Sequence, residues 1–273
     1  MGIPTPNFIQ RFGLPDFLSE YKFFDTSLDN HIKFAFHALA LDEQRSPFGP
    51  TVWERKVGCN TVLKQTWFPG VHSNVGGSYD DTELADITLA WMMDNLSAWI
   101  DFNPKYVKEQ YLANQKRNTA RGIERGWGLG RIYESCTFPT SIMGREPRTP
   151  TFYHRFDYFT HRETNEPLLD TNETIHPSVR VRIRRGGKGY EDNGKYKPGA
   201  LNHWKIEEQE SHEGHPETNG SHDHNKKQPV KWMYQGKNPK GKDKFLLEEV
   251  LGRYELELLR LDEAAATEVL GAN

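Results

Sequence analysis

Cysteine is scarce in this chain, and so are long apolar runs. Two cysteines in 273 residues, Cys59 and Cys136, are too few for a disulfide framework or for a zinc site made of thiolates. No apolar run approaches the roughly 20 residues that a membrane-spanning helix requires. The N-terminus lacks the pattern of a signal peptide, and Pro6 stands where N-acylation requires serine or threonine. We therefore predict a protein of the reducing cytoplasm that has no transmembrane segment.

An excess of charge of either sign is also absent. The 35 basic and 38 acidic side chains leave a formal net charge of −3, so the composition gives no indication of a nucleic-acid partner. Aromatic residues make up 12% of the chain, which argues against disorder throughout. A chain of this length can bury one sizeable core to which exposed segments are added.

Hydrophobic periodicity predicts the regular structure of the first half. Apolar residues spaced three or four apart predict a helix over 26–42. The β-branched and aromatic run 61–68 predicts a strand that ends at Pro69. A broad apolar face predicts a long helix over 82–100, and a shorter helix is expected over 104–118.

The second half begins with an irregular segment. Residues 119–152, rich in Gly, Arg and Pro, predict a long ordered loop. Strict alternation in "SVRVRIR" predicts a strand over 178–184 that carries Arg180, Arg182 and Arg184 on one face. A solvated edge is the ordinary interpretation of that face, and contact with phospholipid head groups is the alternative.

Composition divides the chain into three parts. Residues 206–228 contain almost no apolar side chains and cannot bury enough surface to order themselves, so we predict a disordered polar insertion. An amphipathic helix is predicted over 245–266. The predicted boundaries are 1–204 for the main folded portion, 205–229 for the insertion and 230–273 for a C-terminal segment.

The stretch "FPGVHSNVGG", residues 68–77, contains the main catalytic candidate, His72. A strand, a glycine-rich loop with one histidine and then a helix is the way in which α/β-hydrolases deliver the base of their catalytic triad. A loop suits that task because one ring nitrogen must face a serine hydroxyl while the other faces a carboxylate. The alternative is a histidine that forms only local hydrogen bonds in a turn.

Residues on both sides of His72 are candidates for supporting it. The glycines allow positive φ and close approach to a substrate, and the small polar residues could orient the imidazole or shape the turn. The carboxylates that precede the long helix are expected to cap its N-terminus. Orientation of the His72 ring is the alternative. The predicted supporting residues are Gly70, Ser73, Asn74, Gly76, Gly77, Asp80 and Asp81.

Two longer stretches carry a resemblance to a known family. "FHALALDEQRSPFGPTVW" and "LKQTWFPGVHSNVGGSYDDTELADITLAWMMDNL" resemble an uncharacterised α/β-hydrolase domain family, which includes the catalytic domain of the type VI secretion phospholipase effectors and has many fungal members. The resemblance is dense over 22–100 and looser to about residue 204. It implies a parallel sheet flanked by helices and hydrolysis of a carboxylic ester, such as a phospholipid, without metal or organic cofactor. In that family the "PGVHSNVGG" loop carries the base, which corresponds to His72.

The departure from the family pattern is equally informative. The family's nucleophile lies in a Gly-x-Ser-x-Gly elbow and its acid in a "Trp-Asp-Thr-Val" segment, and this sequence contains neither. The nearest stretch, "GGSYD" around Ser78, follows His72 instead of preceding it. The resemblance therefore implies the C-terminal portion of an incomplete α/β-hydrolase domain with a family-specific extension. We predict that this chain alone is inactive.

Two further functions remain open at this stage. A catalytically dead interaction module would use the charged insertion and the C-terminal helix to bind a protein partner. Alternatively, the chain complements a separate N-terminal half, which would dock on its exposed sheet edge.

Other histidines are weaker candidates. His176 in "TIHPSVR" is the alternative base, against a structural role at the end of a strand. The insertion holds several histidines in polar surroundings, which indicates adventitious metal binding at most, and we predict no specific metal site. These are His212, His215, His222 and His224.

Overall fold

The centre of the structure, a computed structural model, is a six-stranded sheet with the strand order β2-β4-β7-β10-β9-β8. The strands from β2 to β10 run parallel to their neighbours, and β9 and β8 then run antiparallel. The expected α/β class is confirmed. The described residues are 26–136, 145–157, 162–207, 230–237 and 244–271. The strands are β2 (Phe34–Ala40), β4 (Val62–Phe68), β7 (Glu173–Ile175), β8 (Trp204–Ile206), β9 (Lys231–Tyr234) and β10 (Phe245–Glu248).

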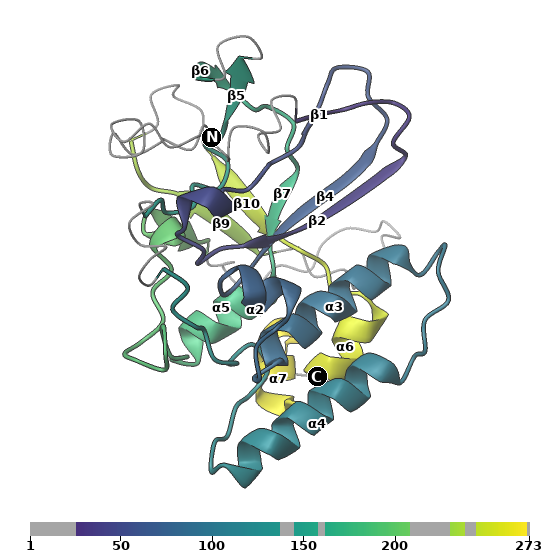
Figure 1. Cartoon of the computed structure of the whole chain (residues 1–273), viewed down its shortest axis with the longest axis vertical. Helices are drawn as coiled ribbons and strands as arrows, with labels where there is room; N and C mark the ends of the chain where they lie inside the picture. The colour runs from purple at the N-terminus through teal and green to yellow at the C-terminus, as the bar shows by residue number, and fades with distance from the viewer. Residues whose placement is uncertain (1–25, 137–144, 158–161, 208–229, 238–243, 272–273) are drawn as a thin grey trace, which may run out of the picture.

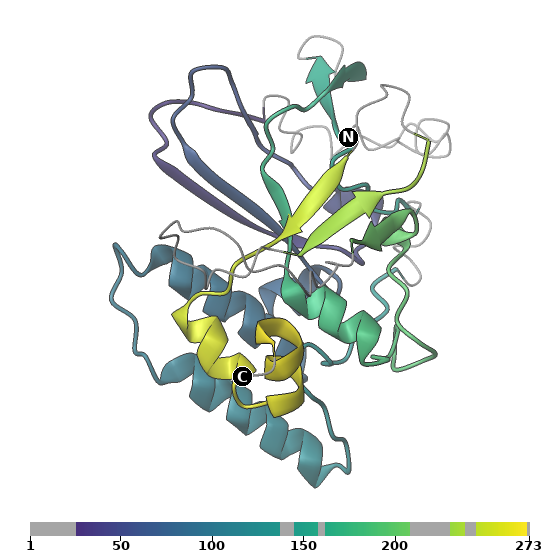
Figure 2. The ribbon, with the colours of Figure 1, turned by 180° about the vertical axis from the view of Figure 1, so that it is seen from behind.

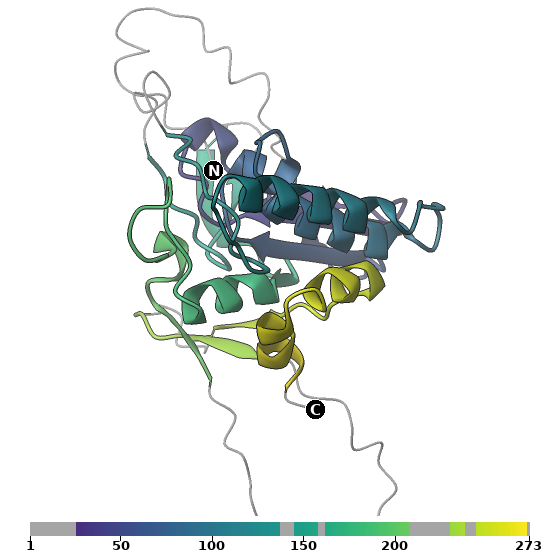
Figure 3. The same ribbon diagram turned by 90° about the horizontal axis from the view of Figure 1, so that it is seen from below.

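The helices gather on one side of the sheet, where residues of α3, α4, α6 and α7 share one apolar cluster with Phe68 of β4. Figure 1 shows them below the sheet, and Figure 3 shows α3, α4 and α6 in the view from below, where α6 packs against α3 and α4. Figure 2 shows β10, β9 and β8 at the end of the sheet that is remote from β2. The helices are α2 (His72–Gly76), α3 (Glu83–Leu96), α4 (Tyr106–Ala120), α5 (Pro177–Arg184), α6 (Arg253–Leu259) and α7 (Glu263–Leu270). Two small sheets pair β1 (Ser27–Leu28) with β3 (Glu54–Arg55) and β5 (His154–Asp157) with β6 (Arg162–Pro167).

The core lies on both faces of the sheet. Trp67 and Phe68 are consecutive residues of β4, yet they belong to two different apolar clusters. Trp67 packs with Ile175 of β7, whereas Phe68 lies in the cluster of Trp91 of α3. Side chains alternate across a strand, so a strand with both faces covered must be apolar almost throughout.

The predicted helix over 26–42 is wrong, because β2 lies within it. "FAFHALA" is apolar on both faces, and residues three or four apart are apolar in any such run. Its backbone pairs in parallel with β4, from Phe34 opposite Val62 to Ala40 opposite Phe68. Pairing in the sheet therefore overrides the helical spacing.

The predicted strand over 178–184 is also wrong, because these residues form α5. Pro177 occupies the first turn, where its missing N–H and fixed φ favour a helix. The Nδ1 of His176 accepts the backbone N–H of Ser178 at 3.2 Å and thereby caps the helix. The capping signal was present in the sequence, but the alternation of arginine and aliphatic residues obscured it.

Two of the three arginines of this segment, Arg180 and Arg182, are buried, whereas Arg184 is exposed as predicted. Arg180 is 3% exposed and forms a bidentate pair with Glu248 of β10 at 2.8 and 2.9 Å. Arg182 is fully buried and donates to the carbonyl oxygens of Gly128 and Gly130 at 3.0 and 2.6 Å. These two guanidinium groups hold α5 inside the protein, so they do not offer a surface for phospholipid head groups.

The predicted helix over 245–266 is wrong in its first part. Residues Phe245–Glu248 form β10, and the chain then enters α6 after Gly252. Asp94, near the end of α3, accepts the N–H groups of Tyr254 and Glu255 at 3.0 and 3.1 Å. The start of α6 is therefore capped by a distant carboxylate, which local sequence patterns do not reveal.

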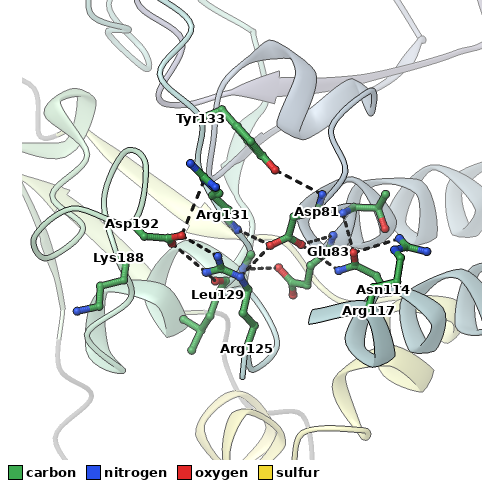
Figure 4. A network of polar contacts seen from close by, with 12 residues as sticks. Asp81, Glu83, Asn114, Arg117, Arg125, Leu129, Arg131, Tyr133, Lys188 and Asp192 are labelled. Carbon is green, nitrogen blue, oxygen red and sulfur yellow. Dashed lines mark hydrogen bonds and ion pairs between the residues drawn. The ribbon is translucent and has the colours of Figure 1, made fainter. Parts of the chain in front are cut away.

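The strand predicted over 61–68 and the helices predicted over 82–100 and 104–118 are confirmed as β4, α3 and α4. The expected ordered loop after α4 is also present among the described residues (Figure 4). Glu83 accepts the N–H groups of Gly128 and Gly130, both at 2.7 Å, and Asp81 pairs with Arg125 at 2.8 Å. Carboxylates at the start of α3 thus order an irregular segment. The predicted polar insertion lies outside the described residues from position 208 onward.

Candidate functional site

His72 lies at the carboxyl end of β4, in the first turn of the short helix α2. The strand ends at Phe68, and Gly70 then turns the chain with a φ of +106°. A Cβ atom at Gly70 would lie 2.5 Å from the Cβ of Asn74, so only glycine fits. The carboxyl ends of parallel strands are the usual place for binding sites in α/β proteins.

Two carboxylates at the end of the neighbouring strand β2 hold the backbone of this loop. Asp42 Oδ2 accepts the N–H of Gly70 at 2.6 Å, and Glu43 Oε2 accepts the N–H of His72 at 3.1 Å. The N–H of Asp42 donates in return to the Gly70 carbonyl at 3.0 Å. We call this pair the Asp42–Glu43 clamp. Its residues are 5% and 1% exposed, so they position His72 from inside the protein.

The two carboxylates of the clamp differ in pKa. Burial raises the pKa of Asp42 to about 6, although hydrogen bonds from Gly70 and the Tyr196 hydroxyl oppose the rise. Burial alone would also raise the pKa of Glu43. Hydrogen bonds from the Arg45 side chain at 3.0 and 2.8 Å, from its backbone and from the His72 N–H instead bring that pKa to about 2. Glu43 is therefore a fixed anion, whereas the pKa of Asp42 lies closer to neutral pH.

A cavity of about 880 Å³ opens beside His72. It lies between β2, α2 and α3, and most of its lining is apolar. The His72 ring is exposed and its centroid stands 5.0 Å from that of Phe48. Among the described residues, neither ring nitrogen of His72 has a hydrogen-bond partner, so the imidazole can still accept a proton from a reacting group. The polar residues of the lining include His37, Glu43, His72, Asp86 and Arg148.

The residues that directly follow His72 shape the loop. Asn74 accepts the Val71 N–H at 3.2 Å and donates to the Arg131 carbonyl at 2.8 Å. Gly76 and Gly77 line the cavity, and Gly77 has a φ of +89°. The two hydrogen bonds of the Asn74 side chain thus hold the backbone of the loop in place.

The remaining supporting candidates point elsewhere. Ser73 is half-buried and contacts Tyr79, and Asp80 is exposed. Asp81 accepts from Asn114 at 2.9 Å and takes part in the network of Figure 4. Within the described part of the chain, none of these side chains hydrogen-bonds the His72 ring.

His176, the alternative base, lies inside the protein at the carboxyl end of β7. Its Nε2 is 2.8 Å from Glu255 Oε1, and its Nδ1 is 2.6 Å from Ser178 Oγ. The three residues have the composition of a Ser-His-acid triad, yet each is at most 1% exposed. None of them lines the cavity beside His72. A substrate cannot reach this group, so it serves as a polar bridge between α5 and α6.

Sequence reasoning missed the Asp42–Glu43 clamp and placed His37 on a helix. The available signal was the pair of carboxylates that directly follows the apolar run "ALAL", since a strand there ends beside the His72 loop. His37 instead lies on β2 and lines the cavity, with its Nδ1 3.2 Å from Gln65 Oε1. Burial lowers the pKa of His37, which favours the neutral ring.

The described residues contain no group of three or more His, Cys, Asp and Glu side chains that is arranged to hold a metal ion. Over the same ranges, no helix is both long enough and apolar enough to cross a bilayer. The histidines at 212–224 lie outside the described residues.

Comparison with known proteins connects the site to one family. The sequence model of the family described as "T6SS, Phospholipase effector Tle1-like, catalytic domain" matches residues 1–95. The matched range covers β1 to β4, the Asp42–Glu43 clamp and His72, and it ends within α3. No curated protein and no solved structure matches the chain. The similarity therefore suggests a lipase-like hydrolase family for the part of the chain that contains the candidate site.

Proposed function

We propose that this chain provides His72 as the general base of a serine hydrolase that acts on carboxylic esters, phospholipids among them. One observation carries the proposal: His72 stands at the carboxyl end of a parallel strand, beside a mostly apolar cavity, inside the range similar to a phospholipase catalytic domain. A fold alone does not define an activity, so the proposal depends on the geometry of this site.

In the proposed reaction, His72 takes the proton of a serine hydroxyl as the serine oxygen attacks the acyl carbonyl. It then donates that proton to the leaving alcohol. Two features support this role. The ring is reachable from the cavity, and the Asp42–Glu43 clamp holds its backbone without using its ring nitrogens. The apolar lining suits the hydrocarbon part of a lipid ester.

The nucleophile has to come from outside these residues. No Gly-x-Ser-x-Gly elbow occurs between residues 1 and 273, and Ser78 in the nearest match is exposed with a φ of +105°. We therefore expect no measurable turnover from these residues alone, because a triad without its serine loses on the order of 10⁴–10⁶ in rate.

The alternative of an interaction module that uses the C-terminal helix has less support. Leu258 and Leu259 of α6 and Ala265 of α7 are fully buried, so these helices use their apolar faces inside the protein. The charged insertion that this alternative also needs lies outside the described residues, apart from its first residues.

The test compares the native protein, captured from its own cells through an antibody against α7, with variants made at the natural locus. The probes are p-nitrophenyl butyrate, mixed micelles of phosphatidylcholine and a fluorophosphonate that labels activated serines. We expect His72→Ala to lose about 10⁴-fold in turnover and to abolish labelling. His31→Ala, at an exposed histidine outside the cavity, is the control. Unchanged turnover in His72→Ala would refute the proposal.

A further inference from the structure

Asp86 is a buried carboxylate in the wall of the cavity beside His72, and the proposed reaction does not use it. It lies in the first turn of α3 and is 6% exposed. Its Oδ2 accepts the hydroxyl of Thr82 at 2.8 Å, whereas its Oδ1 has no hydrogen-bond partner among the described residues. Within the same ranges the side chain accepts no backbone N–H, so it does not serve as a helix cap.

Other buried carboxylates of this protein are compensated more fully. Glu43 and Glu248 each face a guanidinium group at 2.8 Å. Glu83 accepts two backbone N–H groups, and Asp42 accepts one backbone N–H and one hydroxyl. A buried charge is costly unless it is paired or well supplied with donors. Asp86 has a single neutral donor, which leaves it the least compensated of the five.

The other charged side chains of the cavity wall already have their partners. Arg148 donates to three backbone carbonyl oxygens at 3.3, 3.2 and 2.6 Å. Both oxygens of Glu43 accept N–H groups of Arg45 at 3.0 and 2.8 Å. Asp86 therefore has the acceptor atom that is left over for a ligand of this cavity.

The electrostatic surroundings of Asp86 agree with the missing counterion. Burial raises its pKa to about 7, the charge of Asp81 adds to the rise, and Thr82 and Arg117 oppose it. Arg117 is exposed and donates to Asn114 at 3.2 Å, so it does not pair with the carboxylate. A positive charge bound at Asp86 would favour the ionised form and offset the cost of its burial. A perturbed carboxylate in a cleft is a common mark of a functional site.

The rest of the wall decides which cation fits. The apolar residues Leu89 and Met92 of α3 face the same cavity as Phe36 of β2. A metal ion would need several more ligands, and the described residues contain no group of three or more side chains arranged to hold one. An ammonium group attached to a hydrocarbon chain can donate to Asp86 while the chain covers the apolar wall. Tyr106 of α4 lines the same cavity, and aromatic rings attract ammonium groups.

We propose that Asp86 anchors a subsite that binds the positively charged amino group of an apolar ligand in this cavity. The subsite follows from the described residues alone: a buried carboxylate with a spare oxygen, an apolar wall and a volume of about 880 Å³. Together with the proposed function, it makes the substrate an ester that carries an amino group, such as an amine-headed lipid. Only this last step rests on the proposed function.

The test is an NMR titration of the purified chain with hexylammonium and with its neutral counterpart, hexanol. We expect hexylammonium to bind at least tenfold more tightly than hexanol and to shift the amide signals of Leu89 and Tyr106. Asp86→Asn preserves the size of the side chain and an acceptor for Thr82. It should lower the affinity for hexylammonium to that for hexanol and leave hexanol binding unchanged. Asp80→Asn, at an exposed carboxylate outside the cavity lining, is the matched control.

Equal affinity of the wild type for the amine and the alcohol would overturn the subsite. So would an Asp86→Asn variant that binds hexylammonium as tightly as the wild type. A second measurement needs no variant. The pKa of the Asp86 carboxyl group, followed by ¹³C NMR, should fall by at least about one unit in saturating hexylammonium and stay unchanged in hexanol. An unchanged pKa in hexylammonium would also overturn the subsite.

Two short-chain lipids, used as monomers, separate an amine-headed ester from a free amine. Dihexanoylphosphatidylethanolamine should bind more tightly than dihexanoylphosphatidylglycerol, and Asp86→Asn should abolish that preference. Equal affinity for the two lipids, with the preference for hexylammonium intact, would support the subsite but refute the ester step. Binding requires no turnover, so these results are independent of the nucleophile. Unchanged turnover in His72→Ala would refute the proposed function and leave the subsite standing.

Discussion

Glu43→Gln is the substitution that tests the Asp42–Glu43 clamp most directly. The side chain of Glu43 is 2% exposed, and that of its partner Arg45 is 15% exposed. The carboxylate accepts hydrogen bonds from the Nε and a terminal nitrogen of Arg45, at 3.0 and 2.8 Å. It also accepts the backbone N–H of His72. The amide keeps the shape but loses the charge, so the guanidinium is left without its counterion.

Two independent estimates give the size of the effect. Removing one partner of a buried ion pair costs about 3–5 kcal/mol. The pKa of Glu43 lies at about 2 instead of 4.5, and about 2.5 units at roughly 1.4 kcal/mol each correspond to about 3.5 kcal/mol of folding stability at pH 7. Because the pKa is lowered on folding, this contribution is complete above the unfolded value and is lost as the pH falls toward the folded value. At pH 3 about 1.4 kcal/mol should remain.

The assay is urea unfolding of the wild type and of Glu43→Gln at pH 7 and pH 3. We expect the free energies of unfolding to differ by about 3.5 kcal/mol at pH 7 and by less than half of that at pH 3. Glu257→Gln is the control. The Oε1 atom of Glu257 lies 3.4 Å from the Nε of Arg253, whose side chain is 71% exposed. Loss of such a surface pair should cost less than about 0.5 kcal/mol. If the wild type and Glu43→Gln differ in free energy of unfolding by the same amount at both pH values, or by less than about 1 kcal/mol at pH 7, the ion pair does not hold the loop.

Three further predictions concern buried groups. Arg180→Met should cost about 3–5 kcal/mol by leaving Glu248 unpaired, and Glu248→Leu in the same chain should restore much of that loss, as measured by thermal unfolding. Burial and the charge of Asp81 raise the pKa of Glu83 to about 8, so the wild type should lose stability as the pH rises from about 5 to 9. Glu83→Gln should lose less over that range, and parallel pH profiles would contradict the assignment. His176→Ala should cost at least about 2 kcal/mol through the lost helix cap and the unpaired Glu255, whereas His72→Ala should leave the unfolding midpoint unchanged.

The sequence predicts those elements whose local pattern and tertiary role agree. β4 and α3 were correct because one has β-branched and aromatic residues and the other a broad apolar face. β2 and α5 were wrong for a common reason: β2 is apolar on both faces and α5 mixes buried arginines with aliphatic residues, so neither shows a reliable period. Burial of Arg180 and Arg182 made α5 harder to predict, because charged residues ordinarily indicate an exposed face.

Only those parts of the candidate site that depend on local sequence could be predicted. His72 could be found because a strand, a glycine turn and a helix follow one another within a short local stretch. The clamp could not, since Asp42 and Glu43 reach the loop only through the pairing of β2 with β4. The buried group around His176 was equally hidden, because Glu255 lies 79 residues away along the chain.

The clamp also explains why His72, which follows β4, faces a cavity along β2. Asp42 and Glu43 draw the backbone of Gly70 and His72 over the end of β2. His72 accordingly lines a cavity whose wall is β2 rather than its own strand. The clamp therefore carries a histidine from the end of β4 to the mouth of a cavity formed by β2 and α3.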